Sequence, residues 1–256
     1  MRVVEFTYQK NARDIGGMVT SNGKKVKTGL IFRGGSLAHV SPSDIEKIKS
    51  LGITDIVDFR GKEEFEHKPD YKFENVEFHN FPTMKMKEDD KNIQHEDSNL
   101  LFFLNDTSQA AQHMMNLYSD SVISDIGKVA YRNFFNLLMQ NNKVIYFHCS
   151  QGKDRAGLAA YLLEIALGID PISAREDYLF SNVAMQAKIV QLKNMVKDKN
   201  FYNREYEIAM DHVFTARNEY LDQAINSIEK NFGSILNYLE KELGVDIKHL
   251  REKYLD

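Results

Sequence analysis

The chain of 256 residues has little material for covalent or metal cross-links: it contains one cysteine, four prolines and no tryptophan. A single cysteine excludes a disulfide within the chain and a metal site built from cysteine thiolates. The eight histidines are scattered, with no pair at ligand spacing on an expected helix, so the sequence predicts no metal and no cofactor. No Pro-, Gly- or Ser-rich linker divides the chain, and we expect a single domain over residues 1–256.

The chain also lacks a charge excess and a long apolar run. Its 33 basic and 37 acidic residues are well mixed and give a net charge of −4, which argues against binding nucleic acid. The longest apolar stretch, Gly157–Gly168, is too short to cross a bilayer and contains Glu164, so we expect no integral membrane association. The N-terminus does not have the pattern of a signal peptide. We expect a cytoplasmic protein, and secretion stays open for a chain whose leader has been removed.

What the chain does contain is a polar loop between an apolar strand and an apolar helix, in the run VIYFHCSQGKDRAG over residues 144–157. Cys149 and Arg155 bracket five residues of this loop. The backbone N–H groups from Ser150 onward can point into one concavity, the helix adds the positive end of its dipole, and a guanidinium can hold two oxygens at once. Gly152 lets the loop turn tightly. Such a loop fits a dianionic phosphate group.

Cys149 is the candidate nucleophile in this loop. The positive field that binds a phosphate also stabilises a thiolate, which is the nucleophilic form of cysteine. A lone cysteine is more often a buried and inert small side chain. Here the segment SQGKDR that follows is too polar for a core, which favours the reactive interpretation.

The segment HCSQGKDRAG resembles the signature loop of the cysteine-dependent protein tyrosine phosphatases. The presence of Lys153 and Asp154 is typical of the bacterial, fungal and atypical plant branch whose loops read HCxxGKDR. Further segments similar to this branch lie along nearly the whole chain: Asn11–Gly17, Leu30–Gly35, Ile56–Arg60, Phe232–Leu239 and Leu250–Arg251. The resemblance implies a protein-tyrosine-phosphatase-like α/β fold and hydrolysis of phosphate monoesters through a phosphocysteine. It implies phosphotyrosine or phosphoserine/threonine proteins, or phosphoinositides, as substrates.

The sequence departs from the pattern of many tyrosine phosphatases in two places. Ala156 follows the arginine where many members carry a threonine or serine, whose hydroxyl helps the cysteine leave as a thiolate. Slow hydrolysis of the intermediate is the expected consequence. Because the chain has no tryptophan, it also lacks the mobile Trp-Pro-Asp loop of the larger eukaryotic enzymes, and its general acid must come from another segment.

Two aspartates lead the candidates for that general acid. Asp154 lies one residue before the arginine, and the family resemblance points to it. Asp58 follows an apolar run and is expected at the C-terminal end of a strand, where open α/β sheets bind ligands. We rank Asp154 first. The alternative for each is a structural role: Asp154 as a brace of the loop, and Asp58 as an ion-pair partner of Arg60 or Arg33.

The remaining loop residues are expected to bind the phosphate or to support the loop. Lys153 adds a second positive charge, which favours substrates with more than one phosphate, although a solvated lysine is the ordinary alternative. His148 is expected to orient the loop and tune the thiolate. Arg13 and Asp14 are expected to brace the loop as an ion pair. The expected phosphate-binding set is Ser150, Gln151, Gly152, Lys153, Ala156 and Gly157.

Strand patterns and helix patterns alternate along the chain up to residue 168. Ser41 and Pro42 are typical of a helix start, and Gly52 of a helix end. The expected strands are Leu30–Phe32, Ile53–Asp58, Val76–Phe81 and Val144–His148, and the expected helices include Pro42–Ser50, Ile123–Gln140 and Arg155–Leu167. This order favours a small, mostly parallel central sheet flanked by helices, with the polar loop at the C-terminal end of a central strand.

From Asp170 onward the pattern is almost entirely helical. The family resemblance favours an additional helical lid or insertion in about residues 170–232, whereas the ordinary alternative is that these helices complete the core. Apolar side chains that such a lid would present are Met195, Phe201, Tyr202, Tyr206, Met210 and Phe214. An acidic segment at 88–90, with His95 and Asp97 nearby, is a second candidate lid and a third source of the general acid.

Two other classes of protein remain open. Cys-x5-Arg loops also occur in sulfurtransferases and arsenate reductases, but the reductases typically need further cysteines, which this chain lacks. A phosphate-binding module with little turnover is the other alternative, suggested by Ala156. Whether the chain is a phosphatase or a phosphate-binding module, the expected partner is a phosphotyrosine protein or a phosphoinositide.

Overall fold

The structure, a computed structural model, describes residues 2–84, 109–197 and 204–256. Within these residues six strands form one sheet in the order β1-β2-β3-β6-β4-β5. The strands β3, β6, β4 and β5 are parallel, and β1 and β2 extend the β3 edge with antiparallel pairing. Their bounds are Arg2–Val3 (β1), Arg13–Asp14 (β2), Ile31–Gly34 (β3), Asp55–Asp58 (β4), Glu77–Asn80 (β5) and Ile145–His148 (β6). The mostly parallel central sheet is therefore confirmed.

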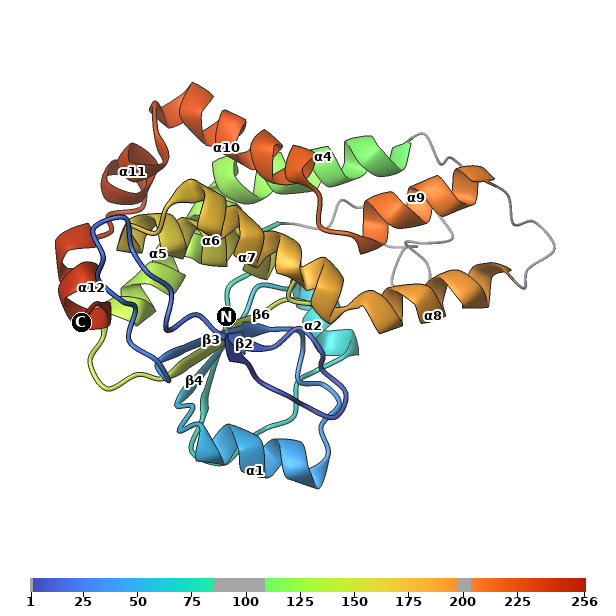
Figure 1. Cartoon of the computed structure of the whole chain (residues 1–256), viewed down its shortest axis with the longest axis horizontal. Coiled ribbons are helices and arrows are strands. Elements are labelled where there is room, and N and C mark those ends of the chain that lie inside the picture. The colour runs from blue at the N-terminus through green and yellow to red at the C-terminus, as the bar shows by residue number, and fades with distance from the viewer. Residues whose placement is uncertain (1, 85–108, 198–203) are drawn as a thin grey trace.

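Helices cover both faces of this sheet, with α1 on one face and most of the others on the opposite face (Figure 1). Their bounds are Pro42–Ser50 (α1), Lys62–His67 (α2), Gln109–Ile123 (α4), Asp125–Met139 (α5), Arg155–Leu167 (α6), Pro171–Ala184 (α7), Gln186–Lys197 (α8), Arg204–Phe214 (α9), Asn218–Phe232 (α10), Ile235–Asn237 (α11) and Ile247–Tyr254 (α12), with a π-helical turn at Tyr238–Glu242. The helix α6, which follows the polar loop, is buried almost throughout.

Local signals in the sequence set the ends of α1. The Ser41 side chain accepts a hydrogen bond from the backbone N–H of Asp44, and the Asp44 carboxylate accepts one from the N–H of Ser41. Pro42 occupies the first turn, where no backbone donor is needed. Gly52 follows the helix with φ of 67°, the left-handed conformation that ends many helices. The expected helix 42–50 is therefore confirmed.

Other boundaries match or shift slightly. The expected helix 155–167 is present unchanged as α6. The helix expected at 123–140 is α5, which starts later because Ser124 caps it and residue 123 ends α4. All four expected strands are present, although β4 begins at Asp55 and not at Ile53.

Strand side chains alternate between two apolar layers. Phe32, Ile56 and Tyr146, which are paired across β3, β4 and β6, face α1 in the smaller core. Their neighbours Val57 and Phe147 face the larger core, which contains α5, α6 and the C-terminal helices. Because both faces are covered, the position of the strand ends, and of the loops that leave them, is fixed.

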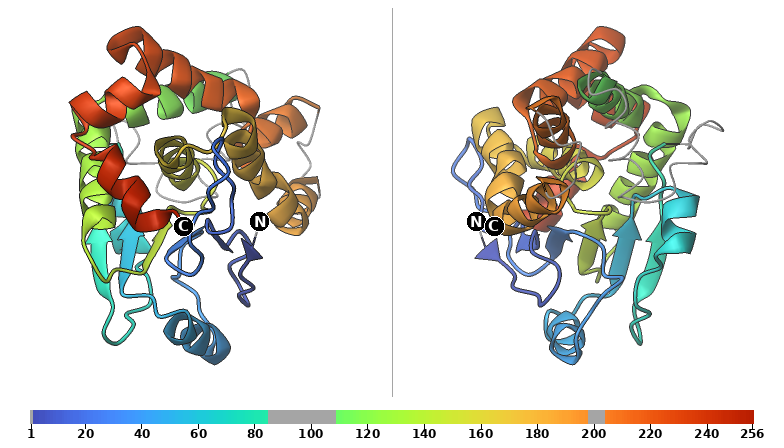
Figure 2. Two further views of the ribbon diagram at one scale, coloured as in Figure 1. Left: turned by 60° about the vertical axis from the view of Figure 1, so that its left-hand side comes forward. Right: turned by 90° about the vertical axis from the view of Figure 1, so that its right-hand side faces the viewer.

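The helices after residue 170 fall into two groups. α7 packs against α6, and α10 packs along α4 on the side of the molecule away from α1 (Figure 2). α8 and α9 extend together from one end of the molecule (Figure 1). Met210 and Phe214 of α9 are buried with Met185 and Ile189. The expectation that Met210 and Phe214 present an exposed apolar surface is wrong, because these side chains pack against the neighbouring helix.

Several features expected from the sequence lie outside the described residues. They are the acidic segment 88–90 with His95 and Asp97, the residues Phe201 and Tyr202, and the side chain of Met195. Tyr206 is partly buried against the cluster between α8 and α9. Across residues 2–84, 109–197 and 204–256, no helix is both long and apolar enough to cross a membrane.

A buried group of charges joins the sheet to α7. The Asp177 carboxylate of α7 accepts hydrogen bonds from Arg13 Nε at 2.7 Å and from Arg33 Nη1 at 2.5 Å. Both arginines are fully buried. Burial alone would raise the pKa of Asp177, but the two guanidinium groups lower it to about 2. Burial and the nearby Asp177 raise the pKa of Glu164 well above its ordinary value, which favours the neutral form of this carboxyl.

Asp14 does not pair with Arg13, contrary to the expectation from the sequence. Its two carboxylate oxygens accept the backbone N–H groups of Gly16 and Gly29, at 2.7 and 2.8 Å. Side chains of successive strand residues point to opposite faces of a sheet, so the two neighbours on β2 cannot face each other. Arg13 supports the loop region through Asp177 instead.

We expect Asp177→Asn to lower the free energy of unfolding by about 3–5 kcal/mol, because both buried arginines would lose their charged partner. Urea unfolding at pH 7 measures this difference. Asp222→Asn is the matched control: its pair with Arg175 is partly exposed, and its loss is expected to cost at most about 1 kcal/mol. If both substitutions lower the free energy of unfolding equally, Asp177 is not the carboxylate that balances the two buried arginines.

Candidate active site

The polar loop lies at the C-terminal edge of the parallel strands. β6 ends at His148 and α6 begins at Arg155, so residues 149–154 connect a strand end to a helix N-terminus. β3 and β4 pair with β6 on either side and end in register with it. Cys149 therefore follows the middle one of three strand ends, and its side chain is buried with 2% of its surface exposed.

Glycines allow the loop to lie directly on the end of β3. Gly152 has φ of 70°, and a Cβ there would come within 2.0 Å of the carbonyl oxygen of Gly34. At Gly35, a Cβ would lie 3.2 Å from the carbonyl oxygen of Ser150. Side chains at these positions would separate two backbones that the structure brings into contact.

Donors outside the loop hold its backbone carbonyl groups. The pairs are Ser36 N–H with Ser150 O (3.1 Å), Asn11 Nδ2 with Gln151 O (3.1 Å) and Arg33 Nη2 with Gly152 O (2.9 Å). In a trans peptide unit the N–H points away from the C=O. Since these three carbonyls point outward, the N–H groups of the next residues turn to the inside of the loop. Inward N–H groups of successive residues form an anion-binding concavity.

Arg155 is fixed by a carboxylate from α2. Both terminal nitrogens of its guanidinium donate to Glu64, the bond from Nη2 to Oε1 measuring 2.9 Å. Ser150 Oγ donates to the same Oε1 at 2.8 Å and lies 3.1 Å from Arg155 Nη2. Burial alone would lower the pKa of Arg155, but Glu64 more than offsets this and raises it. The guanidinium is thus permanently charged and held beside the loop.

Asp154 receives a hydrogen bond from a buried tyrosine. Tyr118 Oη donates to Asp154 Oδ1 at 2.7 Å and also lies 2.7 Å from Tyr178 Oη. Tyr178 in turn contacts the backbone of Arg217, so the chain of hydrogen bonds reaches the start of α10. Burial and the Asp154 charge raise the pKa of Tyr118 well above its ordinary value, so its hydroxyl stays a donor. About one fifth of the Asp154 side chain is exposed to solvent.

Lys153 connects the loop to α9. Its Nζ donates to the carbonyl oxygen of Val213 at 2.5 Å and lies 3.5 Å from Asp154 Oδ2. The side chain is 2% exposed, so it is not the solvated lysine of the ordinary alternative. An ammonium at the C-terminal end of a helix is favoured by the helix dipole. The role of Lys153 toward a second phosphate stays a prediction.

His148 is buried between a carboxylate and a backbone carbonyl. Its Nε2 lies 2.9 Å from Asp70 Oδ2, and its Nδ1 lies 3.0 Å from the carbonyl oxygen of Cys149. Burial alone would lower the pKa of His148, but the charges of Asp70 and Asp58 raise it above its ordinary value. The raised pKa favours the protonated form of the imidazole, which lies directly before Cys149 in the chain.

Asp58 is engaged in a structural ion pair. Arg60 Nε lies 3.0 and 2.9 Å from its two oxygens, and Arg60 also pairs with Asp70 at 3.1 Å. Asp70 further accepts from the N–H of Leu37 and the hydroxyl of Ser36, which ties together the ends of β3, β4 and β6. The contacts of Asp58 match the pairing with Arg60 that the sequence offered as its alternative role.

The first turn of α6 is closely packed. Ala156 is fully buried, and its methyl group offers no hydroxyl to the loop. A Cβ at Gly157 would lie 3.0 Å from the Tyr178 ring and 3.2 Å from Arg33 Nη2. Gly157 therefore supports the loop by letting Arg33 reach the carbonyl of Gly152.

Sequence reasoning missed the side chains that hold the loop from outside: Glu64, Asp70, Tyr118 and Asp177. For Asp177 a signal existed, since it shares the buried face of α7 with Ala174 and Ser181. An acid on a buried helix face indicates a buried cation. Glu64 lies in a six-residue helix with no buried residue, and nothing in its local sequence points to Arg155.

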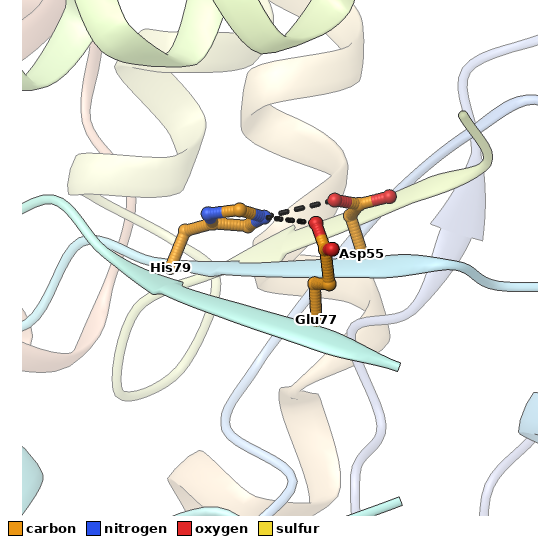
Figure 3. Close-up of side chains that lie close together, drawn as sticks. All are labelled: Asp55, Glu77 and His79. Carbon is orange, nitrogen blue, oxygen red and sulfur yellow. Dashed lines mark hydrogen bonds and ion pairs between the residues drawn. The ribbon is translucent and has the colours of Figure 1, made fainter. Parts of the chain in front are cut away.

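A histidine and two carboxylates near the other end of the sheet are close enough to hold a cation (Figure 3). His79 Nε2 lies 2.8 Å from Asp55 Oδ1 and 3.8 Å from Glu77 Oε2. Lys143 Nζ lies 3.0 and 3.1 Å from the same two carboxylates, so an ammonium already balances their charge. A second group, Asp58, Asp70 and His148, is balanced by Arg60. We assign neither group a metal, and the absence of a metal cofactor stays a prediction.

The Glu64–Arg155 pair predicts a specific pH dependence of stability. Partial loss of hydration alone would raise the pKa of Glu64, but Arg155 lowers it from 4.5 to about 2 in the folded protein. A carboxylate with a lowered folded pKa stabilises the protein above its unfolded pKa, and this contribution is lost as pH falls from about 4.5 to about 2. The stability difference between the parent and Glu64→Gln should therefore be largest at pH 7 and less than half as large at pH 3, which lies within that range.

Urea unfolding at both pH values measures this difference. Glu66→Gln, on the exposed side of the same helix, is the control and should differ little from the parent at either pH. If the difference in unfolding free energy between the parent and Glu64→Gln is the same at pH 7 and pH 3, Glu64 is not the carboxylate whose pKa Arg155 lowers.

Comparisons with known proteins agree with this geometry. The model of the tyrosine phosphatase family matches residues 4–256. A Cupriavidus necator protein named as a tyrosine-protein phosphatase is 30% identical over 254 residues, which are 98% of this chain and 87% of the relative. The triple specificity protein phosphatase PtpB of Mycobacterium tuberculosis is 25% identical over 262 residues, covering 93% of each chain. The chain with this Cys149–Arg155 loop belongs to the tyrosine phosphatase family.

Proposed function

We propose that the protein hydrolyses phosphate monoesters in two steps, with Cys149 as nucleophile. The observation that carries this proposal is the loop itself. Its carbonyls are held outward, its N–H groups turn inward, and Arg155 is fixed beside it while Cys149 lies at its start. A preorganised ring of donors stabilises the charge that develops on the transferring phosphoryl group.

In the first step the Cys149 thiolate attacks phosphorus, an S–P bond forms and the ester P–O bond breaks. Asp154 gives a proton to the leaving oxygen, so the alcohol departs neutral. In the second step a water attacks phosphorus, Asp154 takes its proton, the S–P bond breaks and inorganic phosphate leaves. The thiolate is thereby restored, and neither step needs a redox partner.

Asp154 fits the acid role better than Asp58. Both oxygens of Asp58 contact Arg60, and that side chain is buried. Asp154 is the last residue of the loop, remains partly exposed, and its carboxyl is oriented through one oxygen by Tyr118. A fixed orientation toward the leaving group is what a general acid requires.

The helices α8 and α9 are the part of the expected insertion that suits a lid. The other helices in residues 170–232, α7 and α10, pack into the body of the protein. α9 contacts the loop through the Lys153–Val213 hydrogen bond. A movement of α9 would therefore change the surroundings of Lys153 directly.

The substrate class we propose is a phosphotyrosine or phosphoserine/threonine protein, or a phosphoinositide. The name of the Mycobacterium tuberculosis relative describes it as a triple specificity protein phosphatase. The buried ammonium of Lys153 beside Asp154 supports substrates that carry additional negative charge.

The test is phosphate release, in reductant and EDTA, from phosphotyrosine peptide, phosphoserine peptide and phosphoinositides, with Cys149→Ser as the blank. We expect release by the parent and none by the variant. If the parent releases no phosphate but Cys149→Ser and parent bind the same substrates equally, the protein is the phosphate-binding module that Ala156 suggests, and the hydrolase proposal fails.

The role of Asp154 predicts a dependence on the leaving group. Asp154→Asn should slow phenyl phosphate, a poor leaving group, by about 100-fold or more, since general acid catalysis contributes about 10²–10⁴-fold. Nitrophenyl phosphate has a good leaving group that needs less protonation. Its hydrolysis by Asp154→Asn should therefore be slowed far less. Asp120→Asn, an exposed change on α4, is the control. If Asp154→Asn slows both esters equally, Asp154 is not the acid.

A further inference from the structure

Two buried tyrosine hydroxyls lie next to the candidate general acid. Tyr118 comes from α4 and Tyr178 from α7, and both side chains are fully buried. Tyr118 Oη lies 2.7 Å from Asp154 Oδ1 and 2.7 Å from Tyr178 Oη. Burial raises the pKa of both hydroxyls, so each keeps its proton at neutral pH and has one hydrogen to donate. The hydrogens available to this network can therefore be counted.

Counting these hydrogens sets the direction of the network. An ionised carboxylate only accepts hydrogen bonds, so Tyr118 gives its one hydrogen to Asp154. The hydrogen between the two tyrosines then comes from Tyr178. Because Tyr178 has no further hydrogen, its contact with Arg217 at 3.2 Å is the backbone N–H of Arg217 donating to Tyr178 Oη. The network runs from this N–H through two hydroxyls to Asp154, and every donor points toward the carboxylate.

The fold holds both ends of this network in place. Asn182 of α7 accepts a hydrogen bond from the N–H of Ala216 at 2.7 Å and donates to the carbonyl oxygen of Ala216 at 2.8 Å. The backbone N–H of the next residue, Arg217, is thereby fixed where the network starts. At the other end, Asp154 directly precedes α6. Successive hydrogen bonds polarise one another, so the donor at Arg217 strengthens the bond that reaches Asp154.

The two carboxyl oxygens of Asp154 consequently differ. Oδ1 accepts the hydrogen of Tyr118 at 2.7 Å. Oδ2 lies 3.5 Å from Lys153 Nζ, which donates to the carbonyl oxygen of Val213 at 2.5 Å. Within the part of the chain that the structure describes, Oδ2 accepts no hydrogen bond. Since Oδ1 is already occupied by a donor, a proton that binds to the Asp154 carboxylate is placed on Oδ2.

We propose that Tyr118 and Tyr178 are positioning residues for the general acid, which occupy Oδ1 of Asp154 so that Oδ2 carries the transferred proton. This inference rests on the acid role of Asp154 in the proposed function. In the first step the proton leaves Oδ2 for the oxygen of the departing alcohol, and in the second it returns to Oδ2 from the attacking water. Both tyrosines keep their own hydrogens throughout and act through Asp154, whose orientation they fix before the substrate binds.

Steady-state kinetics of Tyr118→Phe test the proposal, because this change removes the hydroxyl and keeps the buried ring. The kcat for phenyl phosphate should fall about tenfold with little change in KM, since the acid loses a hydrogen bond to its charged form while the loop still binds the phosphate. The kcat for nitrophenyl phosphate, which needs less protonation, should fall about twofold or less. Tyr178→Phe shortens the network and should slow phenyl phosphate about threefold.

Tyr254→Phe is the matched control. Tyr254 of α12 is also fully buried, and its hydroxyl donates to the carbonyl oxygen of Leu138 at 2.8 Å. This variant should keep the parent's kcat for both esters. Competitive inhibition by inorganic phosphate, measured for every variant, reports whether the loop is intact. The proposal is overturned if Tyr118→Phe slows both esters equally, weakens phosphate inhibition more than the control does, or leaves phenyl phosphate hydrolysis as fast as in the parent.

Combining Tyr118→Phe with Asp154→Asn separates this inference from the proposed function. If Tyr118 acts through Asp154, adding Tyr118→Phe to Asp154→Asn should slow phenyl phosphate by less than about twofold further. A further loss of about tenfold overturns the inference and leaves the acid role of Asp154 standing. If Asp154→Asn alone slows phenyl and nitrophenyl phosphate equally, the acid role fails first, and the inference fails with it.

Discussion

The site depends on one constraint: positive charge must be placed around the loop and must be balanced wherever it is buried. Arg13 and Arg33 share the single carboxylate of Asp177, so two guanidinium groups are balanced by one acidic side chain behind the loop. Breaking such a buried pair leaves an uncompensated charge and is strongly destabilising. The charges that favour an anion in the loop are therefore the same charges that hold the sheet, the loop and α7 together.

Backbone geometry turns this charge into a phosphate site. Arg33 uses one nitrogen for Asp177 and another for the carbonyl of Gly152, so the buried ion pair also sets the direction of a loop peptide. On the other side of the loop, Glu64 fixes Arg155, and Asp70 contacts the His148 ring next to the candidate nucleophile. Each catalytic element is thus oriented by a partner from a different segment, which limits the reorganisation needed when a substrate binds.

Short-range features were predictable from the sequence, and long-range partners were not. The Cys149–Arg155 spacing, the strand before it and the helix after it follow from residues that are neighbours in the chain, and α1 and α6 were located to the residue. The expected Arg13–Asp14 pair failed because adjacent strand residues face opposite ways. Asp177 and Glu64 join the site through contacts across 144 and 91 positions of the sequence, which no local pattern encodes.

The central claim is that Cys149 carries the phosphoryl group between the two chemical steps. The most direct measurement mixes the protein with nitrophenyl phosphate, quenches the reaction in acid within one turnover and identifies the modified peptide by mass spectrometry. The account predicts one phosphoryl group on the peptide that contains Cys149, and none after the reaction is complete. Turnover with no phosphorylated Cys149, or with the phosphoryl group on another side chain, would contradict it.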